Sequence, residues 1–301
     1  MPESAGQSDD RMPTRGTPRI LNTSQGRLAF GQRCLIMGIL NVTPDSFSDG
    51  GRYVETGAAA DRAIEMAAEG ADVIDVGGES TRPGADPVAP EEQIRRIVPV
   101  ILQARTCGVT VPISVDTRVA AVAAAALDAG ADMVNDISGV RDDPAMPVLL
   151  ARRRVPFVVM HMQGTPQTMQ RAPKYKDVVA EVAEFFVARA EALAAAGVDV
   201  NRMIVDPGLG FGKTLEHNLA LLRSIRLFGV RWPVLVGPSR KRFLGEILNE
   251  PDAAKRRMGT AAAVAHCALA GVDMVRVHDV EEMRQVVDVC AKLEAGGPHP
   301  P

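Results

Sequence analysis

The chain has 301 residues, of which 46% are hydrophobic, and this is enough for one large core. Its 34 basic and 37 acidic residues give a net charge of −3, which favours neither nucleic acid nor an anionic membrane as a partner. No run of 18 apolar residues predicts a membrane span. The four cysteines lie far apart without a CxxC pair, and the N-terminal stretch has no apolar signal core. We therefore expect reduced thiols and a cytoplasmic protein.

Eight short runs of β-branched and aliphatic residues dominate the pattern along the chain. Residues 1–17 come first and predict a disordered tail, and residues 18–33 predict a hairpin around Gln25-Gly26. The eight runs follow at 35–41, 72–78, 111–117, 132–138, 156–162, 202–208, 233–239 and 273–279. Helical patterns lie at about 57–69, 91–106, 118–129, 144–153, 177–196, 216–229, 253–270 and 280–293. Buried strands that alternate with helices predict a (β/α)8 TIM barrel over 18–293, with the hairpin covering its bottom and a disordered tail at 294–301.

The repeated unit Gly-(Ala/Val)-Asp supports this reading. It precedes strands at 70–72, 130–132 and 271–273, and with an insertion at 197–199. Each copy follows an Ala-rich helical pattern, and glycine suits the position after a helix, where a positive φ is needed. Two longer connections, 41–57 and 77–92, lie at the expected catalytic face and are typical of lids.

Each of the eight runs ends on a polar side chain. These are Asn41, Asp75, Asp116, Asn135, His161, Asp206, Ser239 and the pair Arg276/His278. The carboxylates and amides among them suit the edge of a heterocycle with adjacent N–H and amino donors. A salt bridge or a helix N-cap explains any single Asp better, but a core does not collect several polar groups without a ligand. Asn41 suits a phosphate or Mg²⁺, or else simply caps a turn.

Cations follow the last two runs. Arg240, Lys241 and Arg242 come after the seventh, and Arg276 with His278 ends the eighth. Loops after strands 7 and 8 are the usual phosphate site of this barrel. A solvated helix start is the alternative, but cations there oppose the helix dipole, so a bound anion is favoured.

The glycine-rich segment 206–214 is not a P-loop, because Pro207 stands where GxxxxGK[ST] requires glycine. Its glycines instead let the backbone approach a flat ring with Phe211 as a stacking surface, or they form a plain turn. Met160 and Met162 flank His161 and either contact an aromatic ligand or fill a layer of the barrel. The five histidines show no zinc-ligand spacing.

Taken together, the motifs resemble the dihydropteroate synthase family, which is inhibited by sulfonamides. They are MGILNVTPDSFSDGG, DVGGESTRPG, SVDT, VNDISG, MHMQGTP, DPGLGFGK, GPSRKRF and RVHDV, in family order over about residues 35–292. The resemblance implies condensation of 6-hydroxymethyl-7,8-dihydropterin pyrophosphate with 4-aminobenzoate, with Mg²⁺, in a homodimer. Leu209 stands where many members have Phe, and the N-terminal tail is longer than usual.

The resemblance also implies a role for each motif residue. It places the pterin against Asp116, Asn135, Asp206, Lys241, Met160 and Phe211. It places pyrophosphate and Mg²⁺ at Asn41, Arg276 and His278. It places 4-aminobenzoate beside Thr81, Arg82 and Ser239, with Phe47 and Pro83 as loop walls, and Asp49 completes the closed site. Asp116 and Asp206 would stabilise a cationic pterin after pyrophosphate leaves.

Three other readings fit part of the pattern. A pterin-binding methyltransferase would share the barrel but would not need Thr81-Arg82-Pro83 or the pyrophosphate residues. A non-catalytic paralogue would have lost Asn41, Asp116, Lys241 or the first-loop motif, and none is lost. A phosphosugar barrel would explain the late cations but not the Asp/Asn cluster.

Overall fold

The computed structural model describes residues 19–42, 52–80 and 84–295. Eight parallel strands form one sheet with the order β8-β7-β6-β5-β4-β3-β10-β9. They are β3 (Leu35–Asn41), β4 (Val73–Gly77), β5 (Ile113–Asp116), β6 (Met133–Asp136), β7 (Phe157–Met160), β8 (Met203–Asp206), β9 (Leu235–Val236) and β10 (Met274–Val277). A parallel bridge between Val205 and Val234 joins β8 to β9. The sheet is therefore a nearly closed barrel, and the predicted fold is confirmed.

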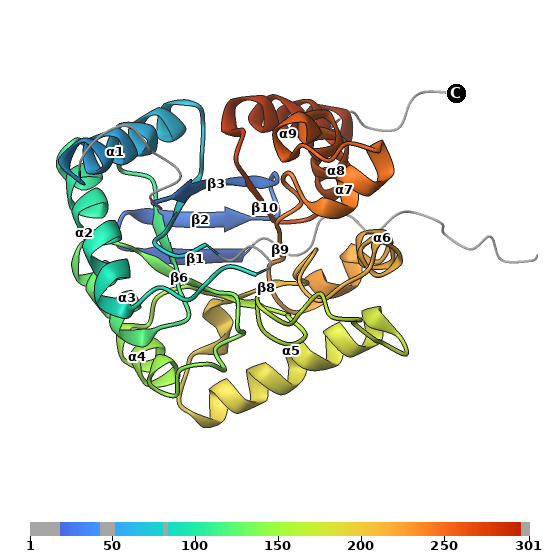
Figure 1. Cartoon of the computed structure of the whole chain (residues 1–301), viewed down its shortest axis with the longest axis horizontal. Coiled ribbons are helices and arrows are strands. Elements are labelled where there is room, and N and C mark those ends of the chain that lie inside the picture. Colours follow the sequence, from blue (N-terminus) through green and yellow to red (C-terminus); the bar gives the residue numbers. More distant parts are fainter. Residues whose placement is uncertain (1–18, 43–51, 81–83, 296–301) are drawn as a thin grey trace, which may run out of the picture.

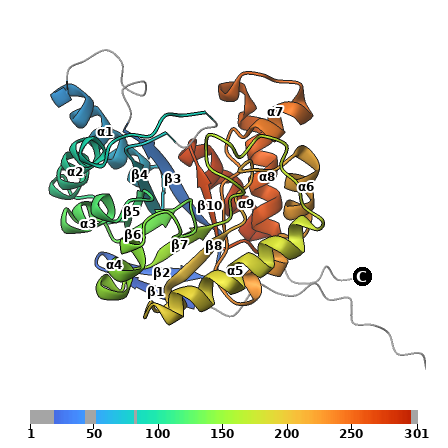
Figure 2. The same ribbon diagram turned by 60° about the horizontal axis from the view of Figure 1, so that its bottom comes forward.

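Helices surround this barrel (Figures 1 and 2). They are α1 (Arg52–Ala68), α2 (Pro90–Thr106), α3 (Ala120–Asp128), α4 (Ala145–Arg153), α5 (Val178–Ala195), α6 (Leu215–Arg223), α7 (Arg242–Leu248), α8 (Arg257–Leu269) and α9 (Val280–Ala295). Short 3₁₀ helices are η2 (Val200–Arg202), η3 (Ile225–Val230) and η4 (Ala253–Arg256).

Several predicted boundaries differ from these. Helix α1 begins at Arg52, inside the connection expected at 41–57. Helix α7 was not predicted. Helix α9 continues through Glu294 and Ala295, beyond the expected boundary at 293, because both are good helix formers and glycines follow only at 296–297. The tail expected at 1–17 and the remainder of 294–301 lie outside the described residues.

The glycines of the repeated unit adopt the backbone that the sequence requires. Gly70, Gly130, Gly197 and Gly271 have φ values of +93°, +108°, +81° and +78°. Each lies two residues after the end of a helix and turns the chain toward the next strand. The predicted helix-glycine-strand unit is confirmed.

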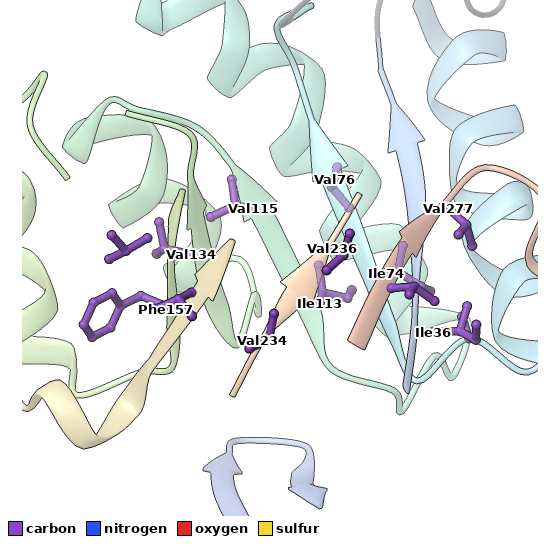
Figure 3. Packing of buried hydrophobic residues seen from close by; sticks show 14 of the residues in the cluster. Ile36, Ile74, Val76, Ile113, Val115, Val134, Phe157, Val234, Val236 and Val277 are labelled. Atoms are coloured by element: carbon purple, nitrogen blue, oxygen red, sulfur yellow. The ribbon is translucent and has the colours of Figure 1, made fainter. Parts of the chain in front are cut away.

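The main core lies between the strands and the helices. Outward-facing strand residues such as Ile36, Ile74, Val115 and Phe157 are buried there (Figure 3). Because alternate strand residues face opposite sides, their neighbours point into the barrel. The barrel is thus buried on both faces, which explains the nearly continuous apolar runs.

The N-terminal hairpin covers the bottom of the barrel (Figure 2). Strands β1 (Arg19–Thr23) and β2 (Gly26–Phe30) pair antiparallel, and Thr23 opposite Gly26 places the turn at Ser24-Gln25, one residue earlier than predicted. The apolar side chains of the hairpin pack on the inward side chains at the strand starts, in a cluster of Leu21, Leu28, Phe30, Leu35, Met37, Val73, Met133, Val158, Ile204, Leu235 and Met274. This confirms the predicted covering role and leaves the other end of the barrel for a site.

Within the described ranges, no helix has the length and apolar character needed to cross a membrane. No disulfide joins the four cysteines, which all lie in the described part of the chain.

Candidate active site

A pocket of about 920 Å³ opens at the carboxyl ends of the strands. Ten of the predicted site residues are described, and nine line it: Asn41, Asn135, Met160, Asp206, Phe211, Ser239, Lys241, Arg276 and His278. The register explains the convergence, since Met160 pairs with Asp206 and Asp116 with Asn135 on adjacent strands. The predicted Phe47, Asp49, Thr81, Arg82 and Pro83 lie outside the described residues.

Asp116 is the tenth residue, and it takes part in a buried ion cluster instead of lining the pocket. The Arg276 Nη2 donates to Asp116 Oδ2 at 2.8 Å, and Arg276 Nε donates to Asp75 Oδ2 at 2.6 Å. Asn135 Nδ2 also donates to Asp75 Oδ2, at 2.9 Å. Arg276 thus lines the pocket and binds Asp116, so the salt bridge weighed as an alternative for Asp116 is formed.

Asp75 was noted at a strand end but given no role. It is fully buried, and its Oδ1 has no hydrogen-bond partner among the described residues. A carboxylate at an inward position of β4 was the signal that could have identified it. Its contacts make it the residue that holds both Asn135 and Arg276 in place.

The buried ion cluster shifts the pKa values of Asp116 and Arg276. Burial raises the pKa of Asp116 to about 7, with Arg276 opposing the shift and Asp75 adding to it. Burial acts to lower the pKa of Arg276, but Asp75 and Asp116 outweigh it, and the pKa is raised. Arg276 is therefore a permanent cation, whereas Asp116 can take up or lose a proton near neutral pH.

Asp206, Lys241 and Phe211 form a second group among the residues that line the pocket. Asp206 Oδ1 accepts from the Gly208 backbone N–H at 2.7 Å. Burial raises the pKa of Asp206, while that hydrogen bond and the nearby Lys241 and Lys213 act against the rise. The Lys241 Nζ lies 4.1 Å from the Phe211 ring centroid, a cation–π contact. Burial lowers the pKa of Lys241 to about 8, with Asp206 opposing.

Ser239 and His278 are hydrogen-bonded to each other. Ser239 Oγ accepts from the His278 backbone N–H at 3.2 Å and lies 2.9 Å from His278 Nδ1. When the ring carries its proton on Nε2, the hydroxyl donates to Nδ1 and the Nε2–H is free for a ligand. Burial, with Arg240 and Arg276, lowers the pKa of His278 to about 3. The ring is neutral at pH 7 and offers a ligand a hydrogen bond but no charge.

The three cations predicted after the seventh run have different surroundings. Lys241 is in the pocket, as described. Arg240 pairs with Asp279, its Nε lying 3.2 Å from Oδ2. Arg242 begins α7, is largely exposed and pairs with Glu246 at 3.0 Å. Their ion pairs account for Arg240 and Arg242 without a bound anion, although both side chains line the pocket together with Lys241 and Arg276.

One wall of the pocket is apolar. It consists of Ile137, Met160, Met169 and Phe211, which are buried and line the pocket. Met162 packs in the same apolar cluster but does not line the pocket, so the ligand-contact alternative is supported for Met160 only.

Lys213 also lines the pocket, and it was missed from the sequence because the segment had been considered only as a P-loop or a ring-approaching turn. It is buried, and burial lowers its pKa to about 7. Its ammonium lies 3.0 Å from His161 Nδ1. A lysine directly before the helix N-cap Thr214 was the available signal, since a cation opposes the dipole there.

The described residues hold no group of three or more His, Cys, Asp or Glu side chains that would bind a metal by themselves. Asn41 is the amide oxygen at the end of β3 that lines the pocket. A hard cation at this position would need further oxygen ligands from a substrate.

The barrel carries acidic, amide and cationic side chains around a pocket with one apolar wall. This arrangement is typical of an enzyme that binds a flat, polar ring. Comparison with known proteins gives the class, because residues 37–278 match the family model described as "Pterin binding enzyme". A dihydropteroate synthase from Synechocystis sp. is 46% identical over 277 residues, covering 92% of this chain and 96% of that protein.

Solved structures agree with this match. Dihydropteroate synthase of Xanthomonas albilineans with 4-aminobenzoic acid has a TM-score of 0.86 at 42% identity, covering 93% of this chain and 100% of that one. The Yersinia pestis enzyme in a sulfonamide drug complex has a TM-score of 0.85 at 39% identity, covering 92% and 100%. The chain therefore belongs to the dihydropteroate synthase family, alkyl-transferring enzymes of folate biosynthesis.

Proposed function

We propose that the pocket at the carboxyl ends of the strands is where this chain carries out the reaction of its family. In that reaction 6-hydroxymethyl-7,8-dihydropterin pyrophosphate condenses with 4-aminobenzoate to give 7,8-dihydropteroate and pyrophosphate. The observation that carries the proposal is the convergence of Asp206, Asn135 and Lys241 on one apolar-walled pocket. Its volume of about 920 Å³ lies within the range of small-molecule sites.

The pterin ring suits the wall formed by Asp206, Asn135 and Lys241. Its ring N–H and amino group are adjacent donors, and a buried carboxylate such as Asp206 accepts from both. Lys241 offers a donor to the ring's carbonyl oxygen, and Met160 and Phe211 supply apolar contact. The Asp206 carboxylate also stabilises positive charge on the ring, and the other groups hold the ring in place.

Arg276 is expected to change partners when the pterin pyrophosphate binds. Contact between a pterin and Asp116 requires the Arg276–Asp116 pair to separate, because Arg276 and not Asp116 lines the pocket. We expect the released guanidinium to move onto the pyrophosphate, with which it forms charge-assisted hydrogen bonds. His278 Nε2–H adds an uncharged donor to the same group. Asp75 retains Arg276 through its Nε during this change.

The bond between the pterin methylene carbon and the pyrophosphate oxygen then breaks, and its electron pair leaves with the pyrophosphate. The electron-rich ring delocalises the positive charge, and the Asp206 and Asp116 carboxylates stabilise it. The neutral aromatic amine attacks the methylene carbon and forms the new C–N bond. Its extra proton passes to water or to the pyrophosphate, so no strong general base is required.

Asn41 supplies only part of the oxygen coordination that Mg²⁺ needs. Mg²⁺ commonly combines one or two protein oxygens with substrate phosphates and water, which agrees with a single amide oxygen at this strand end. Asn41 would hold the ion together with pyrophosphate oxygens. When bound, Mg²⁺ would neutralise charge on the leaving group.

The remaining predicted contacts concern 4-aminobenzoate. Ser239 lines the pocket and is proposed to border this substrate. Thr81, Arg82, Phe47 and Pro83 are proposed to complete its site, and Asp49 to help close it. The relatives with bound 4-aminobenzoic acid and a sulfonamide drug support both ligands here. A homodimer in the cytoplasm remains the expected assembly and location.

The Asp206→Ala variant tests the pterin site. We expect it to lose roughly 2–5 kcal/mol of binding free energy for the pterin pyrophosphate, because the ring's donors lose their buried acceptor. Isothermal titration calorimetry measures this loss. Asp136→Asn is the control, since Asp136 is also a buried carboxylate at a strand end, on β6 two strands from β8, but does not line the pocket. Equal pterin affinity in Asp206→Ala and the unmodified chain would remove Asp206 from the site.

A further inference from the structure

Lys213 is a buried cation whose position in the fold calls for an explanation. Only 4% of its surface is exposed, and it directly precedes Thr214, the N-cap of α6. A positive charge at this end of a helix opposes the helix dipole, and burial adds a desolvation cost. Other contacts must therefore compensate for both.

The ammonium of Lys213 has an acceptor for each of its three protons. Nζ donates to His161 Nδ1 at 3.0 Å, to the His161 carbonyl at 3.3 Å and to the Phe211 carbonyl at 3.0 Å. When Lys213 is protonated it can only donate, so His161 Nδ1 accepts, and the neutral ring then carries its proton on Nε2. All three acceptors are uncharged.

These contacts join the two loops that form one side of the pocket. His161 follows β7, and Phe211 lies in the connection from β8 to α6. Two neighbouring carbonyls of that connection are also held from the β7–α5 side. Gln170 Nε2 donates to the Gly210 carbonyl, and the Tyr175 hydroxyl donates to the Gly212 carbonyl at 2.8 Å. Lys213 thus fills the middle place in a run of three consecutive fixed carbonyls.

The backbones of the two loops lie so close together that their carbonyl groups require hydrogen-bond donors. A Cβ built on Gly208 would lie 2.0 Å from the His161 carbonyl oxygen, and one on Gly212 would lie 2.8 Å from the Gln163 carbonyl oxygen. Carbonyl groups buried at such a tight backbone contact are stable only when hydrogen-bond donors satisfy them. Lys213 supplies two of these hydrogen bonds from a single atom.

Lys213 also acts on the carboxylate of the pocket. Asp206 precedes the same connection, and its negative charge is favoured by Lys213 as well as by Lys241. In return, Asp206 opposes the fall in the pKa of Lys213 that burial causes. Lys241 lies over the Phe211 ring on the pocket side, so the two lysines act on Asp206 from different segments.

We propose that Lys213 is a positioning residue for the pterin substrate, whose ammonium fixes Phe211 and Asp206 by joining the β8–α6 loop to His161. It acts through these two residues and need not touch the substrate. The inference rests on the proposed function, because it assigns the pterin to Asp206 and Phe211.

The test compares steady-state constants for the two substrates in Lys213→Met. Methionine keeps most of the apolar stem but removes the donors and the charge. We expect KM for the pterin pyrophosphate to rise about tenfold or more, and KM for 4-aminobenzoate to stay within about threefold. Lys213→Arg, which keeps the charge and donors, should recover part of the loss. Circular dichroism and the melting temperature establish that the variants are folded.

Tyr175→Phe is the matched control, because it removes an uncharged donor to the next carbonyl of the same loop. We expect its KM for the pterin pyrophosphate to rise less than about threefold. Should Lys213→Met fail to fold, Lys213→Gln carries the same comparison, since it keeps a donor but no charge. An unchanged pterin KM in a folded Lys213 variant would overturn the proposal, as would an equal effect of Tyr175→Phe. Absence of turnover by the unmodified chain would instead count against the proposed function.

Discussion

At the scale of single residues, the sequence could identify the polar groups of the site but not their pairing. Asp116, Asn135, Asp206 and Lys241 were named from strand ends and motifs, and they lie together. Arg276 was expected at a pyrophosphate, and it holds Asp75 and Asp116 in this structure. Arg276, Asp75 and Asp116 come from three strands, and β10 is adjacent to neither of the other two. Which buried charges meet across the barrel depends on side-chain packing between distant segments, which the pattern of a single strand does not contain.

Asp136 allows a prediction on pH and stability. Its Oδ1 accepts from the Ser138 backbone N–H at 2.7 Å and from the Ser138 hydroxyl at 2.6 Å, while Oδ2 has no partner among the described residues. Burial raises the pKa of Asp136 from 3.8 to about 6, with the Ser138 hydrogen bonds opposing. The folded chain therefore binds this proton more tightly than the unfolded chain. The resulting stability is present below pH 4 and is lost as the pH rises through about 6.

Asp136→Asn should remove this pH dependence, since an amide does not titrate there. From below pH 4 to above pH 6, the free energy of unfolding of the unmodified chain should fall by about 3 kcal/mol relative to the variant. Urea denaturation at a series of pH values measures the difference. Parallel pH profiles for the two proteins would show that Asp136 titrates normally.

At the scale of elements, the long helices and the strand ends were predictable, but α7 was not. Its seven residues include Gly245, which lowers helix propensity. A Cβ on Gly245 would lie 2.6 Å from the Glu250 carbonyl oxygen and 2.5 Å from Arg256 Nε. The glycine is thus required by the packing of the following loop, and tertiary contacts, which the local pattern does not contain, stabilise the helix.

Two glycines with positive φ allow the stability cost of backbone strain to be measured apart from the cost of steric overlap. Gly208 has φ +68° and its Cβ would overlap the His161 carbonyl, whereas Gly197 has φ +81° and no atom within 4 Å of the Cβ position. Gly197→Ala should cost about 1 kcal/mol of unfolding free energy from strain alone. Gly208→Ala should cost at least about 2 kcal/mol more, because the two loops must separate. Chemical denaturation compares the variants, and equal losses would refute the close contact between the loops.

At the scale of the whole molecule, the eight apolar runs and their repeated glycine unit predicted the barrel, and the hairpin was placed at its bottom. The shortness of the seventh strand of the barrel was not predictable, because β9 has only two residues and meets β8 through the bridge from Val205 to Val234. The barrel separates its two ends by function. Apolar side chains fill the bottom under the hairpin, and polar side chains surround the pocket at the top.

This separation predicts that the hairpin supports stability and not the chemistry. Phe30 is 1% exposed within the bottom cluster, and Phe30→Ala should cost about 3–5 kcal/mol of unfolding free energy. Ile20 lies in the same hairpin with 56% exposure, and Ile20→Ala should change stability by less than about 0.5 kcal/mol. Thermal denaturation and the pterin KM are to be measured together. A raised KM in a folded Phe30→Ala would contradict the separation of the two ends.

Pyrophosphate release is the most direct measurement of the central claim, that this pocket condenses the two substrates. The chain is mixed with Mg²⁺ and dihydropterin pyrophosphate, with and without 4-aminobenzoate, and dihydropteroate is followed in parallel. We predict equal amounts of dihydropteroate and pyrophosphate when both substrates are present, and inhibition by a sulfonamide. Tight pterin binding without either product would contradict the account and would indicate a non-catalytic pterin-binding protein.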